Sequence, residues 1–322
     1  MKYYLTELHA HTKHSDGDFT THELLDAALA FGYDAIVITD HNTTAPLEEA
    51  KTWDSNELVI LSGMEWTTFF GHLLVIGARK VVDWRKATIE TIDSSLEEIK
   101  AAGGLTGIAH PFSIGSPICT GCHWDFHVQD YGLIDFIEVW NRLNPDEDFR
   151  SQQAYEMWVD LLNLGFRISC SAGRDWHRQE DETDTTALTY VGANVGHADA
   201  LLANLKKGNY YITLGPKIHL SMHQAGKTYV MGDELRVGDS TLKITLEPTK
   251  QAKLKAFNFV GEYLVVWQND QIIACETIEE GIEKELSLEL VPGYLRIEIF
   301  GRGKGHSNKR LVISNPFYIG KA

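Results

Sequence analysis

The order of hydrophobic and polar residues in the first two thirds of the chain predicts alternating helices and strands. The segment THELLDAALAFGY, residues 21–33, has apolar residues at helical spacing, a threonine cap and a glycine near its end, as expected of an amphipathic helix. The apolar run DAIVITD, residues 34–40, follows directly and predicts a buried strand. A helix followed in this way by a buried strand is typical of a β-α-β unit.

The same alternation recurs up to about residue 215. The strand-like runs are LVILSGMEW (58–66), GHLLVIGA (71–78), LTGIAHP (105–111), LIDFIEVWN (133–141) and RISCSAGRDWH (167–177). The helical runs are TIDSSLEEIKAAGG (91–104) and SQQAYEMWVDLLNLG (151–165). This order favours an α/β fold with a mostly parallel sheet or a barrel.

The last hundred or so residues have a different pattern, with strand-like runs and almost no helical spacing. These runs lie in residues 242–250, 262–275, 284–302 and 311–320, with QND and PGY as turn signals. They predict antiparallel strands in a small all-β, sandwich-like domain. We place the domain boundary near Gly215 and Pro216, giving units 1–215 and 216–322. Covering an active-site edge, mediating dimers and binding a polymer are all open roles for the second unit.

Composition narrows the classes of protein. The chain has 322 residues, 43% of them hydrophobic, and a net charge of -16, so we expect a globular protein that does not bind nucleic acid. It contains no apolar run of the ~20 residues that span a bilayer and no leader pattern, so we expect no membrane partner and a cytoplasmic location. Four cysteines in a chain of this length fit a reducing compartment. The oligomeric state stays open.

Two pairs of candidate metal ligands have the spacing of side chains on one face of a strand. His9 and His11 stand two residues apart in TELHAHT, and Asp175 and His177 stand two residues apart in AGRDWHR. Residues i and i+2 of a strand point to the same side, so each pair can enter one pocket. We interpret each pair as chelating.

Between these pairs, most of the predicted strands carry a histidine or a carboxylate at one end. These residues are Asp40, His41, Glu65, His72 and His110. Side chains at the ends of parallel strands converge at one mouth of a barrel or one edge of a sheet. Histidine with carboxylate and without thiolate suits Zn²⁺, Mn²⁺ or Fe²⁺. The candidates are too many for one ion, so we expect two or three divalent metal ions that share a carboxylate.

The motifs HAHTKHSDG, TDHN, GMEW, GHLLVIG, AHP and GRDWH, in this order between residues 7 and 177, resemble the PHP (polymerase and histidinol phosphatase) superfamily. The resemblance implies a distorted (β/α)7 TIM-like barrel that holds up to three metals. The end of the chain, VISNPFYIG, resembles two-domain relatives in which a β-rich module follows the PHP domain.

Carried over by position, the resemblance implies three adjoining metal sites. The first consists of His9, His11, Glu65 and Asp175. Glu65 bridges to the second, which also has His72 and His110, and the third consists of Asp16, His41 and His177. We expect Asp40 not to bind a metal itself but to orient the imidazole of a ligand histidine.

The leading hypothesis is a phosphoesterase that cleaves a small phosphorylated metabolite or nucleotide. A water that bridges two divalent ions becomes a nucleophile near neutral pH, and the ions also neutralise charge on the phosphoryl oxygens. Asp175 is the expected proton acceptor, and we expect the leaving oxygen to be either stabilised at the third metal or protonated by His177. Arg174 either adds positive charge for the phosphate or supports the site from behind.

Three alternatives stay open. The same metal site would serve a carboxyl- or carbamate-ester hydrolase, which is the runner-up. An inactive metal- or ligand-binding module is the second alternative, and polymerase-type proofreading is a minor one, because it needs a DNA-binding surface that the acidic composition does not indicate.

The segment PICTGCHWDFH, residues 117–127, allows two further interpretations. Its CTGCH sequence matches the covalent haem attachment pattern, and its cysteines and histidines, Cys119, Cys122, His123 and His127, resemble the ligands of a structural zinc site. Haem attachment needs an exported context, and zinc sites normally have a longer spacer between the two pairs. We therefore favour a loop that lines the mouth of the pocket.

Overall fold

The chain alternates strands and helices up to residue 213 and is almost entirely strand after it. The computed structural model describes residues 1–115, 121–179, 184–248, 251–255 and 257–320. The elements of the first part are β1 (Lys2–Glu7), α1 (Thr21–Phe31), β2 (Ala35–Ile38), α2 (Pro46–Ala50), β3 (Val59–Thr68), β4 (Gly71–Ile76), the 3-10 helix η1 (Trp84–Lys86), α3 (Ile92–Ala101), β5 (Leu105–Ile108), the 3-10 helix η2 (Tyr131–Leu133), β6 (Phe136–Asn141), α4 (Phe149–Asn163), β7 (Ser169–Gly173), β8 (Leu188–Ala193), α5 (Ala198–Lys207) and β9 (Tyr210–Thr213).

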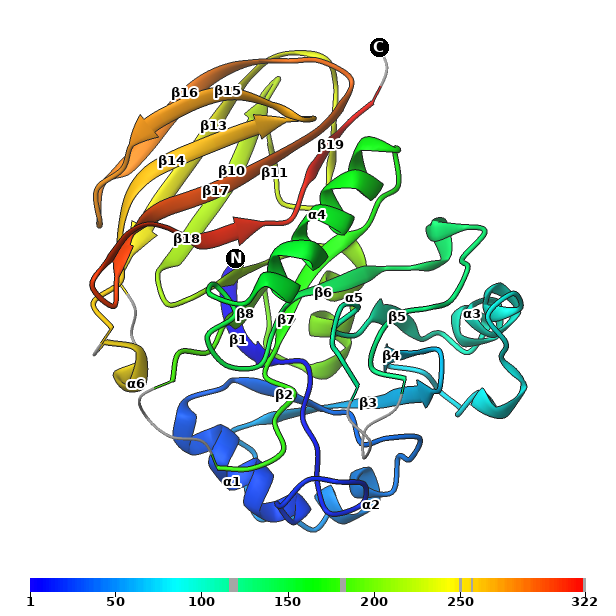
Figure 1. Cartoon of the computed structure of the whole chain (residues 1–322). Coiled ribbons are helices and arrows are strands. Elements are labelled where there is room, and N and C mark those ends of the chain that lie inside the picture. The colour runs from blue at the N-terminus through cyan, green and yellow to red at the C-terminus, as the bar shows by residue number, and fades with distance from the viewer. Residues whose placement is uncertain (116–120, 180–183, 249–250, 256, 321–322) are drawn as a thin grey trace.

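The second part contains β10 (Lys217–Gln224), β11 (Lys227–Tyr229), β12 (Glu234–Leu235), β13 (Gly238–Glu247), α6 (Ala252–Lys255), β14 (Val260–Gln268), β15 (Gln271–Thr277), β16 (Glu283–Leu290), β17 (Gly293–Gly303), β18 (His306–Ser314) and β19 (Phe317–Ile319). Figure 1 shows these strands gathered in one β-rich region, drawn in yellow to red, with α4 beside it. The mixed α/β composition agrees with the sequence pattern.

The first predicted helix is confirmed as α1, together with both of its end signals. The side chain of Thr20 accepts a hydrogen bond from the backbone N–H of Glu23, whose carboxylate accepts one from the backbone N–H of Thr20. Gly32 ends the helix with a left-handed φ of 99°. This reciprocal cap and this glycine are local signals, which is why sequence alone located the helix.

The strands of the first part are neighbours in chain order, from β1 to β7. The β1–β2, β2–β3, β5–β6 and β6–β7 pairs are parallel, whereas β4 is antiparallel to both β3 and β5. Strand β4 is thus the exception, among β1 to β7, to the mostly parallel sheet that the sequence predicted. Only residues 69 and 70 separate β3 from β4, and a parallel crossover needs a connection of a dozen or more residues.

The segments that follow β1 and β7 also lie side by side. Ala10 and Trp176 form an isolated parallel bridge. The N–H of His11 donates to the carbonyl of Trp176 over 2.9 Å, and the N–H of Trp176 donates to the carbonyl of His9 over 3.1 Å. The end of the seventh strand therefore returns to the end of the first.

The large sheet continues from the first part of the chain into the second. Strand β1 pairs with β8, β8 with β9, and β9 with β18. A separate sheet contains β11, β10, β13 and β16 in that order. The QND turn joins β14 and β15 as a hairpin, but the PGY turn joins β16 and β17, which belong to different sheets.

Helix α4 lies between the two parts and buries aromatic side chains. Trp158 is fully buried and its indole N–H donates to the carbonyl of Ile168 over 2.9 Å. On the same helix, the hydroxyl of Tyr155 donates over 2.5 Å to Glu298 of β17. The helix therefore connects the strands of the first part with those of the second.

A search of the described ranges for a helix long and apolar enough to cross a bilayer found none.

Candidate metal centre

The segment after β1 presents two buried histidines to the same pocket. The backbone pairing of residues 9–11 with Trp176 keeps this segment extended, so His9 and His11 point to one side. Both are 0% exposed, and their ring centroids are 5.1 Å apart. The same pairing brings Asp175 and His177 beside them, as the two-residue spacings predicted.

Four buried side chains form a compact ligand set, consisting of His9, His11, Glu65 and Asp175. The Nε2 atom of His9 is 3.3 Å from Oε2 of Glu65 and 3.4 Å from Oδ1 of Asp175. The Nε2 atom of His11 is 3.3 Å from each of the same two oxygens. In a regular tetrahedron, edges of this length place the centre about 2.0 Å from each corner, which is the ordinary distance from Zn²⁺ to nitrogen and oxygen ligands.

The Nε2 nitrogens of the two histidines in this set also lack ordinary hydrogen-bond partners within the described residues. The Nε2 atoms of His9 and His11 are buried and make no hydrogen bond of normal geometry within the described part of the chain. A buried polar atom without a partner costs about 1 to 3 kcal/mol. A cation between the two nitrogens and the two carboxylates would remove this cost, so the residues fit a divalent metal.

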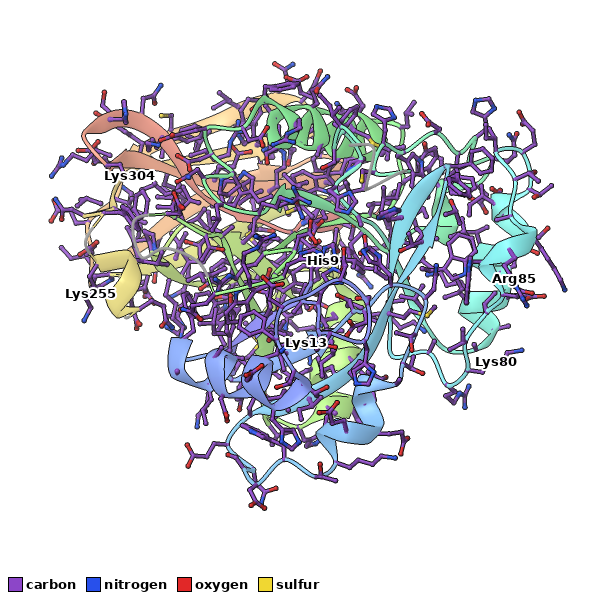
Figure 2. All side chains as sticks on the ribbon, turned by 60° about the horizontal axis from the view of Figure 1, so that its bottom comes forward. His9, Lys13, Lys80, Arg85, Lys255 and Lys304 are labelled. Carbon is purple, nitrogen blue, oxygen red and sulfur yellow. The ribbon has the colours of Figure 1, made fainter. Side chains whose placement is uncertain are left out.

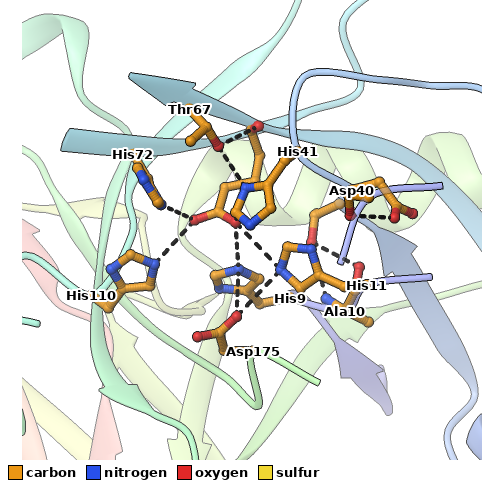
Figure 3. A network of polar contacts seen from close by, with 12 residues as sticks. His9, Ala10, His11, Asp40, His41, Thr67, His72, His110 and Asp175 are labelled. Carbon is orange, nitrogen blue, oxygen red and sulfur yellow. Dashed lines mark hydrogen bonds and ion pairs between the residues drawn. The ribbon is translucent and has the colours of Figure 1, made fainter. Parts of the chain in front are cut away.

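The second oxygen of Glu65 faces a different pair of histidines. Its Oε1 atom is 2.8 Å from Nδ1 of His72 and 3.0 Å from Nε2 of His110. Figure 3 shows His72 and His110 on one side of this carboxylate and His9, His11 and Asp175 on the other. One buried carboxylate therefore adjoins two ligand sets, which is the arrangement expected of a bridging ligand.

A third set lies at the more exposed edge of the pocket, where Asp16 is 54% exposed. The carboxylate of Asp16 is 3.4 Å from Nε2 of His41 and 3.2 Å from Nε2 of His177. His11 faces the same group, with its Nδ1 atom 3.7 Å from Asp16. The structure thus brings together all nine residues that the sequence proposed as metal ligands.

Several site residues have backbone conformations that non-glycine residues rarely adopt. His110 has a φ of 29° and Asp175 a φ of 50°, and each lies two residues beyond the end of a strand, β5 and β7 respectively. Asn42 and Arg142, which follow the ends of β2 and β6, have φ values of 54° and 61°. Such strain persists only where surrounding contacts impose it and is concentrated at functional sites.

Two buried glutamates support the ligands, and sequence analysis did not identify them. Glu138 of β6 lies 2.9 Å from Nδ1 of His9 through Oε1, and its Oε2 accepts from the backbone N–H of His110 over 3.0 Å. Glu7 accepts from the backbone N–H groups of His9 and Arg174. A carboxylate within an apolar strand, as in FIEVWN, is the signal that identifies Glu138 in retrospect.

Strand β7 approaches Glu138 and His9 closely at Gly173. A Cβ atom on Gly173, the last residue of β7, would lie 2.4 Å from the Oε1 atom of Glu138 and 2.5 Å from Cβ of His9. A glycine is required there because real Cβ atoms do not tolerate such distances.

Asp40 is buried near the centre, and the hydrogen-bond partners of its carboxylate in the described part of the chain are Thr12 and Ser15, not an imidazole. It accepts from the backbone N–H and the hydroxyl of Thr12, each over 2.9 Å, and from the hydroxyl of Ser15 over 2.6 Å. The expectation that Asp40 orients an imidazole is therefore corrected. It shapes the turn after His11 that carries Asp16.

The structure separates the roles of two arginines. Arg174 is 2% exposed, and its guanidinium carbon lies 3.7 Å from the ring centroid of Trp176 and 5.1 Å from that of Phe31, so it is packed inside the protein. Arg142 is 54% exposed, and its Nε donates to Oδ2 of Asp175 over 2.8 Å. Arg142, which the sequence analysis did not single out, is the arginine at the mouth of the site.

Electrostatics keep the carboxylates of the cluster charged. Burial alone would raise the pKa of Glu65, but His72, His9 and His41 outweigh it and hold this pKa well below its usual range. For Asp175, His9, His11 and Arg142 likewise outweigh burial and hold the pKa well below the usual value. Burial opposes protonation of His177, but Asp16 and Asp175 raise the pKa of its imidazole to about 9.

The loop that contains CTGCH is described in part, since Cys119 lies outside the described residues. Nδ1 of His123 lies 2.9 Å from Asp125, and Nδ1 of His127 lies 2.9 Å from Glu90, so the two histidines pair with different carboxylates. The haem and structural zinc interpretations of this segment remain hypotheses.

Comparison with known proteins agrees with this geometry. The model of the PHP domain family matches residues 7–211. The chain belongs to the PHP domain family. No curated protein matches the chain at the sequence level.

Solved structures extend the likeness beyond the PHP domain. A two-domain protein from Bacteroides vulgatus, which contains a predicted PHP-like metal-dependent phosphoesterase, is 16% identical with a TM-score of 0.54, covering 98% of this chain and 95% of that one. A lesion-specific endonuclease from Pyrococcus furiosus is 15% identical with a TM-score of 0.44, covering 71% of this chain and 64% of that one. The first likeness shows that the fold of this PHP protein is shared over both parts of the chain.

PHP membership and the buried histidine and carboxylate groups together support a metal-dependent hydrolase.

Proposed function

We propose that the protein is a metal-dependent phosphoesterase that acts on a small phosphorylated metabolite or nucleotide. The observation that carries the proposal is the position of Glu65, whose two oxygens face separate ligand sets within one buried pocket. Two adjoining cations suit a phosphate ester because charge on several oxygens must be neutralised at once. Arg142 adds a third positive charge at the mouth of the pocket.

The donor atoms indicate which ions would be held. Imidazole and carboxylate without thiolate suit Zn²⁺, Mn²⁺ or Fe²⁺. The first ion would be held by His9, His11, Glu65 and Asp175, the second by Glu65, His72 and His110, and a third by Asp16, His41 and His177. When bound, such ions supply Lewis-acid stabilisation of negative charge and activation of a water nucleophile.

The side chains around the ligands have separable tasks. Asp175 directs Oδ1 toward His9 and His11 and Oδ2 toward Arg142, so we assign it as a ligand and not as the proton acceptor. A carboxylate whose pKa is held this low is a poor base. Without a third ion, His177 is suited to donate a proton to the leaving oxygen. A third ion held through the same Nε2 would instead stabilise the negative charge on that oxygen.

A small cavity beside His110 has a volume of about 10 Å³, and its lining includes Glu138, Asn141, Ser151 and Arg150. This volume holds about one water molecule, so the cavity does not receive the leaving part of the substrate. The preference for a small phosphorylated metabolite or nucleotide over a nucleic acid rests on the net charge of -16.

The architecture that we propose follows the same reasoning. The bridge between Ala10 and Trp176 links the ends of the first and seventh strands, which supports a distorted seven-stranded TIM-like barrel. The boundary at residues 215–216 falls between β9 and β10, and the strands beyond it would form a sandwich-like unit.

The test compares hydrolysis of p-nitrophenyl phosphate and p-nitrophenyl acetate by protein loaded with Mn²⁺, Zn²⁺ or Fe²⁺. We expect turnover of the phosphate, lost when His9 and His11 are both changed to alanine. Turnover of the acetate alone would refute the phosphoesterase and favour the carboxyl-ester hydrolase. No turnover of either ester by metal-loaded protein would favour the binding module.

Arg142→Ala tests the assigned arginine separately. We expect a higher KM for the phosphate with unchanged metal content. The matched control is Arg85→Ala, because Arg85 also donates to a carboxylate over 2.8 Å, that of Asp83, but lies at the periphery of the molecule, far from His9 (Figure 2). An equal rise in KM in both variants would contradict the role of Arg142.

A further inference from the structure

The β17–β18 hairpin of the second part contacts the connection between β6 and α4, residues 142–148, through two lysines. Lys304, in the turn of the hairpin, donates to the side-chain carbonyl of Asn144 over 2.8 Å. Lys309 of β18 pairs with Asp146 and, over 3.0 Å, with Glu147. The connection is thus bound at three of its residues by a segment more than 150 positions away in sequence.

The contact between Lys309 and Asp146 is complementary in charge and shielded from water. The side chains of Lys309 and Asp146 are 9% and 4% exposed. Removing one partner of a buried ion pair leaves the other charge without compensation, so such a pair holds its segments firmly in one arrangement. The hairpin offers two lysines to a connection that carries Asp146, Glu147 and Asp148.

The same connection begins with the arginine at the mouth of the site. The backbone N–H of Arg142 donates to the carbonyl of Gly173 over 3.1 Å, and its side chain reaches Asp175. Arg142 and Asn144 have φ values of 61° and 51°, both in the left-handed region. Two such residues this close together need outside contacts to hold them. The hairpin supplies these contacts on one side, and Thr185, which bonds to Asn144, supplies them on the other.

We propose that the β17–β18 hairpin is a positioning element of the active site, in which Lys309 and Lys304 hold the β6–α4 connection so that Arg142 stands beside Asp175 and faces the substrate phosphate. The part of this proposal that concerns substrate rests on the proposed phosphoesterase function. The second part of the chain then completes the substrate-binding mouth, and Lys309 acts through Arg142 without touching substrate.

Other contacts between the two parts make this proposal testable without unfolding the protein. Tyr155 of α4 donates to Glu298 over 2.5 Å, and Arg310 donates to the other oxygen of Glu298 over 2.9 Å. This network joins α4 to β17 and β18 and does not involve Lys309. Loss of the Lys309 pair should therefore loosen the connection and leave the two parts joined.

The kinetic test is a double-mutant cycle with p-nitrophenyl phosphate and metal-loaded full-length protein. Lys309→Met should lower kcat/KM about tenfold, through KM and not kcat, and should have no further effect in an Arg142→Ala background. Lys309→Arg should restore most of the loss. The control is Lys243→Met, which removes a lysine that pairs with Glu285 between β13 and β16. Equal losses for Lys309→Met in both backgrounds would overturn the proposal.

Hydrogen–deuterium exchange provides a readout that does not depend on the substrate. Residues 142–148 should exchange faster in Lys309→Met than in wild type or Lys243→Met, even if p-nitrophenyl phosphate is not hydrolysed. Faster exchange of residues 142–148 without any hydrolysis of p-nitrophenyl phosphate would refute the proposed function and support the positioning role. Unchanged exchange would overturn the positioning role while leaving the phosphoesterase intact. If Lys309→Met does not fold, Lys304→Met at the partly exposed turn gives the same comparison.

Discussion

Replacing Glu138 should weaken metal binding although this residue belongs to none of the ligand sets. Its Oε1 lies 2.9 Å from Nδ1 of His9, and its Oε2 accepts from the backbone N–H of His110 over 3.0 Å and from Asn141 over 2.9 Å. A carboxylate behind a ligating histidine fixes the tautomer and raises the basicity of the other ring nitrogen. Glu138 would therefore leave the lone pair on Nε2 of His9 free to bind a metal ion.

The expected magnitude follows from these contacts. Loss of a carboxylate behind a histidine ligand typically lowers metal affinity by about 10- to 100-fold, or about 1.4 to 2.7 kcal/mol. Glu138→Gln keeps one acceptor oxygen, which can serve either His9 or the backbone N–H of His110, and should stay near the tenfold end. Glu138→Ala leaves Nδ1 of His9 and the N–H of His110 without an acceptor, so it should also destabilise the metal-free protein by about 2 to 4 kcal/mol.

The assay is a competition titration of Zn²⁺ against a coloured chelator, with urea unfolding of the metal-free variants beside it. The control is Glu90→Gln, because Glu90 is also 2.9 Å from Nδ1 of a histidine, His127, but both side chains are more than 60% exposed. Metal affinity in Glu138→Gln equal to that of wild type and of Glu90→Gln would refute the idea that Glu138 orients His9.

Three further predictions concern the ligands and the buried arginine. Glu65→Ala should remove metal and activity together, and mass spectrometry showing full metal content in this variant would contradict the bridging role. In chelator-treated protein, His177 has a folded pKa of about 9, above its usual 6.5, so its stabilising effect is complete below pH ~6.5 and is lost as the pH rises to 9. The difference in unfolding free energy between wild type and His177→Gln should shrink across that range, and a constant difference would exclude this linkage. Arg174→Ala should lower the free energy of unfolding by about 3 to 5 kcal/mol, because it removes the positive charge that compensates the buried carboxyl group of Glu7, whose pKa burial already raises. Normal urea stability with a raised KM would instead place Arg174 at the substrate.

Local signals account for what sequence analysis predicted well. The caps of α1 lie within a few residues of one another, and the two-residue spacing of His9 and His11 has a fixed meaning on an extended strand. Whether two strands pair in a parallel or an antiparallel direction has no such local signal, because it depends on the length of their connection and on the neighbouring strands. The antiparallel course of β4 and the pairing of β9 with β18 therefore escaped prediction.

The sequence by itself predicted which histidines and carboxylates of this PHP protein lie together as candidate metal ligands, because these residues stand at strand ends, and strand ends converge. Only the tertiary structure decided which residues support that set and which arginine faces outward. Glu138 contacts His9 although 129 positions separate them in the sequence, and Lys309 contacts Asp146 at a separation of 163 positions. Arg174 and Arg142 have the same side chain, and the sequence does not tell their roles apart. Arg174 stacks on Trp176 inside the protein, whereas Arg142 has a left-handed backbone conformation and lies at the mouth of the site. Contacts between segments so far apart follow from packing, which no local pattern encodes.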